Sequence, residues 1–362
     1  MLIAGTFAVG GHLREGWIEV SGAGVAATGS GRPPRTPDER CDGVLAPGLC
    51  DLQVNGAGGH EIAGGTAALD AIDAIQLEHG VTSYLPTLVS ADDETAARVL
   101  PELADRAADP ASPVAGVHLE GPFLNPEHAG AHPTHRLRSP ADGVPGWLPG
   151  ARLVTLAPEL PSALELVRTL AGSGVAVALG HSAADAVTAR DAVGAGATLA
   201  THVFNAMGPL HHRAPGLVGV ALVDDRVRPT LVADGVHVDS TVLELARRAA
   251  GPRTILVTDA TPGAAAPPGR YRMGGVEIEA AGGVARTADG TIAGSILTLD
   301  AAVRNWRSMT SATLAEALFA AGELPARSVG LPSGLGAGAP ADLVVVSDDG
   351  DVVRVMRRGR WL

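Results

Sequence analysis

Three side chains with metal-binding chemistry each lie at the end of a short apolar run. Glu120 ends VAGVHLE, His181 lies in VAVALGHS, and His202 lies in TLATHVFNAM. One carboxylate and two imidazoles, with a fourth position left open, make up the ligand set of a catalytic zinc ion. Such an ion lowers the pKa of a water molecule to about 7 and polarises a carbonyl group. We therefore expect Glu120, His181 and His202 to hold one divalent metal ion.

Asp259 ends a further apolar run, TILVTDA, and supplies the proton carrier that such chemistry needs. A carboxylate beside the metal can take a proton from the attacking water and later return it to a leaving nitrogen. A single histidine at a strand end is more often structural, so the prediction depends on several such residues converging. His118 faces the same side of a strand as Glu120 and could support the ligands from behind.

Eight apolar runs alternate with amphipathic stretches through the middle of the chain. Several runs are apolar on both faces, as parallel strands covered by helices are. The alternation predicts an α/β fold, a TIM-like (β/α)8 barrel over residues 47–330, whose functional groups sit at the carboxyl ends of the strands. An open doubly wound sheet is the alternative. The runs are 49–55, 82–89, 114–120, 152–158, 175–182, 198–207, 229–238 and 254–260, and helical patterns include 66–80, 91–108, 160–174, 183–196 and 239–251.

The two ends of the chain have a different pattern. Residues 1–46 contain a strand–turn–strand pattern, and residues 331–362 contain a hairpin with Asp-Gly in its turn. We expect the two ends to pair into one small β-sandwich domain beside the barrel. A β-rich insert is expected at about 270–294, between the eighth strand and the last helix.

The composition of the chain disfavours several classes of function. The formal net charge of −12 repels a phosphate backbone and disfavours a nucleic-acid partner. All the basic residues apart from histidine are arginine, which excludes Schiff-base chemistry on lysine and a metal pair bridged by a modified lysine. Cys41 and Cys50 are too few for a disulfide framework, and no apolar stretch is long enough to span a membrane. We expect a cytoplasmic enzyme.

Taken together, the motifs resemble the N-acetylglucosamine-6-phosphate deacetylase family of the amidohydrolase superfamily. The matching segments, in order, are APGLCDLQVNGAGG (46–59), HLEGPFLNPEHAGAH (118–132), GHS (180–182), THVFNAM (201–207), HRAPGL (212–217), DGVHV (234–238), VTDAT (257–261) and GTIAGSILTLDAAVRN (290–305). The resemblance covers almost the whole chain. It implies a metal-dependent hydrolase that removes acetate from N-acetylglucosamine 6-phosphate and leaves glucosamine 6-phosphate.

The resemblance also implies roles for the residues at the reacting centre. Glu120, His181 and His202 match the family's metal ligands. Asp259 matches the catalytic acid/base. His132 matches a histidine that helps to polarise the acetyl carbonyl, so it counts as both catalytic and substrate-binding.

A second set of matches concerns the sugar phosphate. Asn205, the backbone N–H of Ala206 and His237 match groups that hold this part of the substrate. Arg213 matches an arginine that reaches the phosphate from the neighbouring subunit, which implies a homodimer. An arginine suits this role because its guanidinium presents a two-pronged donor to a phosphate.

The first strand departs from a common pattern. Many amidohydrolases begin it with His-x-His, which binds a second metal, whereas this chain has Gln53-Val54-Asn55. Amides are poor zinc ligands, and part of the family shares this version. We therefore expect one divalent ion per subunit, with zinc as the predicted metal.

Three other functions stay open at this point. The same chemistry could act on N-acetylgalactosamine 6-phosphate, because one epimeric hydroxyl is read by contacts that the sequence does not locate. A cyclic-amide hydrolase of the hydantoinase kind is disfavoured by the missing lysine and the missing His-x-His. A metal-binding scaffold without catalysis is disfavoured by the complete ligand set together with Asp259.

Overall fold

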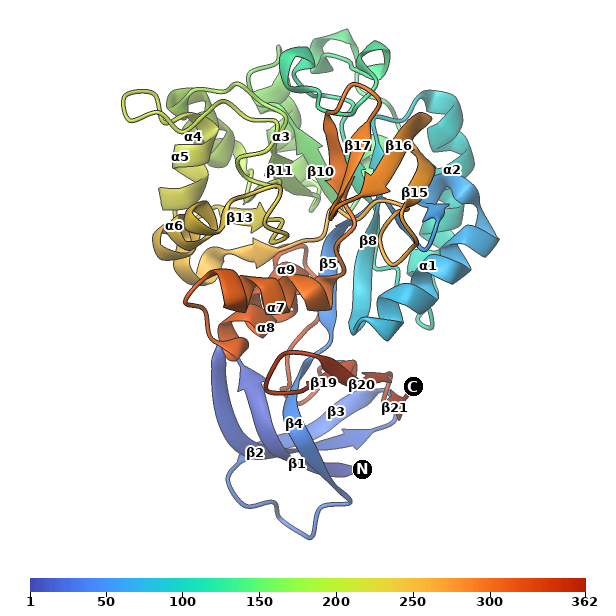
Figure 1. The fold of residues 1–362 in the computed structure, drawn as a ribbon, viewed down its shortest axis with the longest axis vertical. Helices are drawn as coiled ribbons and strands as arrows, with labels where there is room; N and C mark the ends of the chain where they lie inside the picture. The colour runs from blue at the N-terminus through green and yellow to red at the C-terminus, as the bar shows by residue number, and fades with distance from the viewer.

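The computed structural model describes residues 1–362, except for the side chain of Pro149. Its centre is an eight-stranded parallel sheet in which each strand lies beside the next one along the sheet, in the order of the chain. The predicted barrel is confirmed, and each of its strands falls on a predicted apolar run (Figure 1). The strands are β5 (Leu49–Val54), β8 (Val81–Val89), β9 (His118–Glu120), β10 (Leu153–Leu156), β11 (Ala176–Leu179), β12 (Leu199–Ala200), β13 (Arg228–Leu231) and β14 (Ile255–Leu256).

A short contact between the first and last strands closes the barrel. Val54 forms a parallel bridge with Ala260, and the Asn55 N–H donates to the Ala260 carbonyl oxygen at 2.8 Å. The contact matters for function because it brings the end of β5, with Gln53 and Asn55, beside Asp259 at the end of β14.

Helices cover the outside of the barrel, and aspartates begin several of them. The side chains of Asp92, Asp185 and Asp239 each accept a hydrogen bond from a backbone N–H two or three residues later. Such caps satisfy N–H groups that the helix leaves free. The helices are α1 (Thr66–Glu78), α2 (Asp93–Ala108), α3 (Ala163–Gly172), α4 (Ala186–Ala195), α5 (Gly216–Val223), α6 (Ser240–Ala250), α7 (Leu299–Met309), α8 (Leu314–Ala321) and α9 (Glu323–Ser328), with short 3-10 turns η1 (Ile62–Gly64) and η6 (Gly251–Arg253).

The two chain ends form a separate seven-stranded sheet, at the bottom of Figure 1. Strand β4 from the N-terminal part pairs antiparallel with β19 from the C-terminal part, with Leu45 opposite Val345. The predicted joining of both ends into one β domain is confirmed. Ile3, Phe7 and Met356 lie in its apolar core. Its strands are β1 (Leu2–Val9), β2 (His12–Ser21), β3 (Gly24–Ser30), β4 (Glu39–Pro47), β19 (Leu343–Val346), β20 (Val352–Arg357) and β21 (Arg360–Trp361).

Two segments stand over the same end of the barrel (Figure 1). The loop after β9 contains the 3-10 turns η2 (Pro126–His128), η3 (Thr134–Arg136), η4 (Pro140–Asp142) and η5 (Leu148–Gly150). After β14, an antiparallel insert consists of β15 (Gly269–Met273), β16 (Val276–Ala281), β17 (Val284–Thr287) and β18 (Ile292–Ser295). A small hairpin, β6 (Gly56–Ala57) and β7 (His60–Glu61), follows β5. Among the described helices, none combines the length and apolarity that a membrane crossing requires.

Candidate active site

A cavity of about 370 Å³ opens at the carboxyl ends of the barrel strands. Its walls come from the strand ends, from the loop after β9 and from the insert. Nearly all of the predicted site residues line it: Glu120, His132, His181, His202, Asn205, Ala206, His237 and Asp259. The insert adds Met273, Ala293 and Gly294 to the wall. The barrel thus brings together residues that lie far apart in the sequence.

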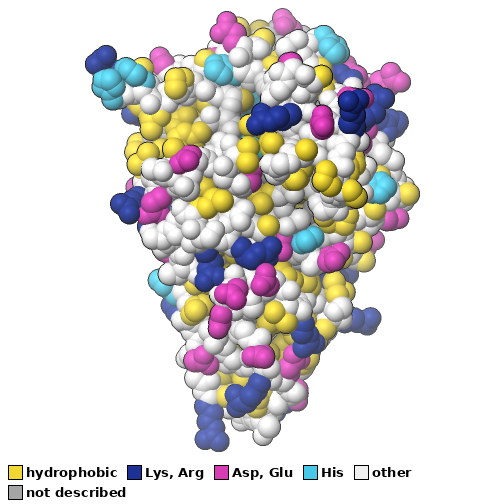
Figure 2. Space-filling view, in the orientation of Figure 1, with side chains coloured by type: hydrophobic (Ala, Val, Ile, Leu, Met, Phe, Trp, Pro, Cys, Tyr) yellow, Lys and Arg dark blue, Asp and Glu magenta, His cyan; other side chains and the backbone are white. Residues whose placement is uncertain are grey.

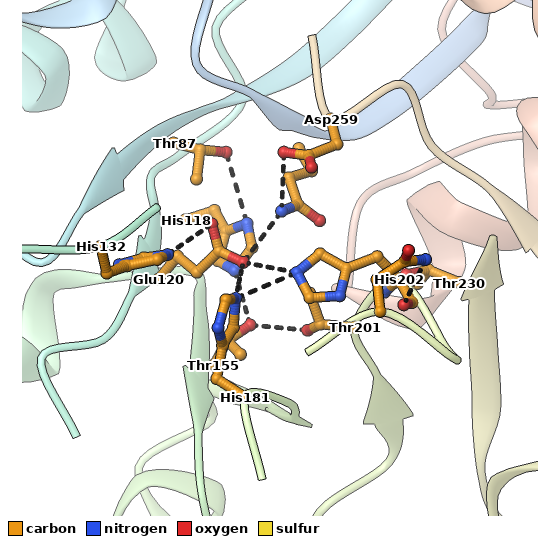
Figure 3. A network of polar contacts seen from close by, with 12 residues as sticks. Thr87, His118, Glu120, His132, Thr155, His181, Thr201, His202, Thr230 and Asp259 are labelled. Carbon is orange, nitrogen blue, oxygen red and sulfur yellow. Dashed lines mark hydrogen bonds and ion pairs between the residues drawn. The ribbon is translucent and has the colours of Figure 1, made fainter. Parts of the chain in front are cut away.

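Three of these side chains form a tight triangle deep in the cavity (Figure 3). Glu120 Oε1 lies 3.2 Å from His181 Nε2 and 3.0 Å from His202 Nε2, and the two imidazole nitrogens lie 3.1 Å apart. All three residues are buried. Ligands placed tetrahedrally at zinc distances of about 2.0–2.1 Å would be about 3.3 Å apart, so the triangle has nearly the size that such an ion requires.

The donor chemistry of the triangle also fits a cation. His181 Nδ1 lies 2.8 Å from the carbonyl oxygen of His128, which can only accept, so Nδ1 carries the proton and Nε2 presents a lone pair. Burial lowers the pKa of His181 to about 4, which keeps its ring neutral. Burial works to raise the pKa of Glu120, but the imidazoles of His132, His181 and His202 around the carboxylate outweigh it and hold that pKa well below its usual range. A carboxylate and two imidazoles converge here as ligands do around a divalent metal.

His132 offers a further imidazole at the rim of the triangle. Its Nε2 lies 3.6 Å from Glu120 Oε2, and its Nδ1 lies 2.8 Å from Ser90 Oγ. Ligand atoms of Glu120, His132 and His181 all lie within 4.8 Å of one another, so this trio could also hold an ion. The trio with His202 is the more compact one, because its three atoms converge at 3.0–3.2 Å. His132 lines the cavity beside this more compact trio.

Asp259 lies beside the triangle, and the side chain of Gln53 connects it to Glu120. Gln53 Nε2 donates to Glu120 Oε1 at 3.0 Å and to Asp259 Oδ1 at 3.1 Å. Asn55 Nδ2 donates to the same Asp259 oxygen at 2.8 Å. Burial, and then the charge of Glu120, raise the pKa of Asp259 to about 6. A carboxyl with that pKa can both take up and release a proton near neutral pH.

A network of buried hydrogen bonds holds the backbone around Asp259. Asp259 has a φ of +50°, in the left-handed region that side-chain-bearing residues seldom adopt. Just before it, the Thr258 hydroxyl donates to Asp51 Oδ2 at 2.6 Å, and the Ser295 hydroxyl donates to the Thr258 carbonyl oxygen at 2.6 Å. His181 and His202 also have positive φ, +49° and +31°. Such strain is concentrated at functional sites and persists only where surrounding contacts hold it.

His118 lies beneath the ligands, as the alternation of strand faces predicts. Its Nε2 contacts the Thr155 hydroxyl at 2.8 Å, and its Nδ1 lies 3.3 Å from Thr87 Oγ1. Burial lowers its pKa to about 4. His118 therefore fills the barrel interior and joins β9 to Thr155 of β10 and Thr87 of β8.

The residues matched to sugar-phosphate binding also line the cavity. His237 Nδ1 contacts Asp234 Oδ2 at 2.6 Å, and its buried Nε2 has no partner among the described residues. Asn205 and Ala206 belong to the turn after β12, where the Asn205 side-chain amide donates to the His202 carbonyl oxygen at 3.2 Å. The unpartnered nitrogen of His237 is free to bind a ligand in the cavity.

Arg213 is the one predicted site residue that does not line the cavity of its own chain. It is exposed on the loop before α5, with its guanidinium 2.8 Å from His212 Nε2, and His211 is also exposed. This loop projects from the body of the molecule at the upper left, where arginine and histidine side chains gather at its tip (Figures 1 and 2). Arg213 therefore lies outside the pocket that its own chain builds.

Three features of the site have no counterpart in the predictions. The contacts of Gln53 and Asn55 with Asp259 were missed, although their replacement of His-x-His indicated that this strand end faces the site. The contribution of Met273 was missed because the insert carries no motif before residue 290. The left-handed backbone at the strand ends has no pattern in side-chain type, because the residues involved are not glycines.

A family model for the amidohydrolase family matches residues 44–362. Among characterised relatives, N-acetylglucosamine-6-phosphate deacetylase from Homo sapiens is 41% identical over 87% of this chain and 83% of its own length. N-acetylgalactosamine-6-phosphate deacetylase from Escherichia coli O157:H7 is 38% identical over 93% of each chain.

Solved structures give the same match in three dimensions. A mutant N-acetyl-D-glucosamine-6-phosphate deacetylase from Mycobacterium smegmatis, in complex with N-acetyl-D-glucosamine-6-phosphate, is 35% identical and superposes with a TM-score of 0.92. That comparison covers 100% of this chain and 98% of the other. The corresponding enzyme from Thermotoga maritima is 28% identical, with a TM-score of 0.91 and coverage of 100% and 99%.

Proposed function

The chain belongs to the amidohydrolase family, in the group of the N-acetylglucosamine-6-phosphate deacetylases, and we propose on this basis that it hydrolyses N-acetylglucosamine 6-phosphate to acetate and glucosamine 6-phosphate. This reaction belongs to the breakdown and recycling of amino sugars. The substrate assignment is supported by relatives that carry this activity in their names over most of the chain.

The observation that carries the proposal is the contact of one amide with two carboxylates. Gln53 Nε2 touches both Glu120 and Asp259, so the proton carrier lies beside the ligand set. Hydrolysis of an unactivated amide needs both an activated water and a proton for the leaving nitrogen. The described arrangement offers groups for both tasks in one buried site.

We assign the steps to residues as follows. A divalent ion held by Glu120, His181 and His202 would lower the pKa of a water molecule and polarise the acetyl carbonyl. Asp259 takes a proton from the water as the water oxygen attacks the acetyl carbon. His132 donates a hydrogen bond to the carbonyl oxygen, on which negative charge develops. Asp259 then gives its proton to the sugar nitrogen as the carbon–nitrogen bond breaks.

The sugar phosphate would occupy the part of the cavity that Asn205, Ala206 and His237 line. Asn205, the N–H of Ala206 and the free nitrogen of His237 are the proposed contacts within the chain. Arg213 is proposed to reach the phosphate of a partner subunit in a homodimer, because it is exposed and does not line its own cavity.

The metal and the compartment are narrower proposals. We propose zinc, one ion per subunit, because the ligand set is one carboxylate and two imidazoles and because Gln53 and Asn55 replace the histidines of a second site. The two free cysteines, Cys41 and Cys50, support a reducing compartment, for which we propose the cytoplasm.

N-acetylgalactosamine 6-phosphate is the second candidate substrate. The 38% identical Escherichia coli relative named for that sugar is the observation that favours it. The two sugars differ at one hydroxyl, and the hydrolytic groups would serve both equally.

Acetate release tests the proposed function. The purified protein should release acetate from N-acetylglucosamine 6-phosphate faster than from the galactosamine epimer, and far faster than from the unphosphorylated sugar. A higher rate with the epimer would assign the second candidate. No acetate release from any of the three by the zinc-loaded protein would contradict both.

A further inference from the structure

The two oxygens of the Asp259 carboxylate have different surroundings. Oδ1 accepts hydrogen bonds from Gln53 Nε2 at 3.1 Å and from Asn55 Nδ2 at 2.8 Å. Oδ2 has no such donor among the described side chains and lies beside Gly294, where an added Cβ would come within 3.5 Å of it. Gly294 lines the cavity, so Oδ2 lies at the cavity wall and is the oxygen that no side-chain donor of the described residues occupies.

The two amides are fixed donors. Gln53 uses both N–H groups of its side chain, one on Glu120 and one on Asp259. If either amide were turned over, it would place a carbonyl oxygen against a carboxylate, so the charges decide the orientation. Both residues are buried, with 2% and 3% of their surface exposed, and water therefore cannot easily replace them.

The Asn55 side chain also reaches the cavity in which the substrate is proposed to bind. Its Oδ1 is buried without a partner among the described residues, and Asn55 lines the cavity. The side chain thus connects the cavity to Asp259 without touching Glu120. This separates its effect from any effect on the metal ligands.

We propose that Gln53 and Asn55 are positioning residues that occupy Asp259 Oδ1 and leave Oδ2 as the single oxygen that carries the proton. This inference rests on the proposed function. The proton of the attacking water passes to Oδ2 while the water oxygen forms its bond to the acetyl carbon, and the carbonyl π electrons move to the carbonyl oxygen. Oδ2 then returns the proton to nitrogen, the carbon–nitrogen bond breaks, and the carbonyl re-forms.

A fixed orientation of the Asp259 carboxylate matters because a single oxygen must serve both proton transfers. The same oxygen must meet the water first and the leaving nitrogen afterwards, so a carboxylate free to rotate would lose alignment at one of the two transfers. Misplacement by about 1 Å at a reacting centre can cost about 100-fold in rate. Two donors on Oδ1 fix the rotation of the carboxylate.

Asn55→Leu tests the proposal with a side chain of similar size that cannot donate. We expect kcat for the amide substrate to fall about 100-fold, with KM within about threefold of wild type. The ester analogue, 2-O-acetylglucose 6-phosphate, should lose less than about tenfold, because an alkoxide leaves with far less help from a proton donor than an amine does. Gln53→Met should show the same difference between amide and ester.

The zinc content of Asn55→Leu should equal that of wild type. Gln76→Met is the matched control, since it makes the same change as Gln53→Met at another buried glutamine, in α1. It should leave both rates within twofold.

An amide rate for Asn55→Leu within threefold of wild type would overturn the proposal, and so would equal losses on amide and ester, which indicate a merely structural role. Failure of the wild-type protein to release acetate would instead contradict the proposed function.

Discussion

The two ends of the proposed site, the buried metal-binding end and the exposed loop before α5, are built in different ways. At the buried end, Glu120, His181, His202 and Asp259 are each at most 9% exposed, and their orientations are fixed by contacts of 2.8–3.2 Å. At the end proposed for the phosphate, Arg213 on the loop before α5 is exposed and does not line the cavity of its own chain.

The difference suggests a division of tasks: the buried groups are proposed to carry out hydrolysis, and the exposed loop is proposed to recognise the phosphate. The buried groups hold one another, so under the proposed function a single chain would supply the groups for hydrolysis. The exposed loop has little to fix it within its own chain, which fits a role that begins when a second subunit supplies the surface. The predictions below test this division.

Removal of the metal should have the largest effect. Because the proposed metal activates the attacking water, chelation should reduce acetate release to background for every substrate. Added zinc should restore acetate release, and the loss on chelation should be the same for phosphorylated and unphosphorylated sugars. Full activity after the metal content has fallen to zero would contradict the ligand assignment.

Asp259→Asn should be next in size. An amide cannot take or return the proton, so kcat should fall about 10³- to 10⁴-fold, the upper part of the range for acid–base catalysis. Zinc content and substrate affinity, measured by calorimetry, should stay near wild type. A variant with kcat near wild type would remove Asp259 from the proposed role.

Arg213→Met should affect the other end alone. Loss of a charged hydrogen bond of about 1.5–3 kcal/mol should raise KM for the phosphorylated sugar about 10- to 100-fold and leave kcat almost unchanged. The unphosphorylated sugar should be unaffected. Arg226→Met, at an exposed arginine paired with Asp224, is the matched control and should change neither constant.

Mixed dimers sharpen this prediction. A chain with Arg213→Met and an intact Asp259, paired with a chain that carries Asp259→Asn and an intact Arg213, should regain one site of normal KM. If Arg213 acts within its own chain, mixing should restore nothing.

The smallest effect is expected for the ion pair between His79 and Asp300, which lies outside the proposed site. A hydrogen bond with Asp300 raises the pKa of His79 against the opposing effect of burial. A raised folded-state pKa means that the pair stabilises the protein below the unfolded pKa of about 6.5 and loses this effect as pH rises through the folded pKa. His79→Gln should therefore lower the free energy of unfolding by about 1 kcal/mol at pH 6 and by less at pH 9.

Denaturant unfolding at the two pH values measures this difference. His12→Gln, at an exposed histidine in β2, should show no such dependence on pH. An equal loss for His79→Gln at pH 6 and pH 9 would contradict the ion-pair account.

The sequence predicted the barrel and the buried end of the site because both leave local patterns. Apolar runs mark buried parallel strands, and ligand-type residues at their ends follow from the barrel geometry, as Glu120 and His181 illustrate. The contacts of Gln53 with two carboxylates depend on barrel closure between β5 and β14, which no local pattern encodes. The place of Met273 depends on how the insert folds back over the mouth.

The most direct test of the central claim is an anomalous-difference map from crystals of the zinc-loaded protein. We expect one strong peak per chain, within about 2.0–2.2 Å of Glu120 Oε1, His181 Nε2 and His202 Nε2. A peak held by His132 in place of His202, or a second peak of equal strength at Gln53 and Asn55, would contradict it.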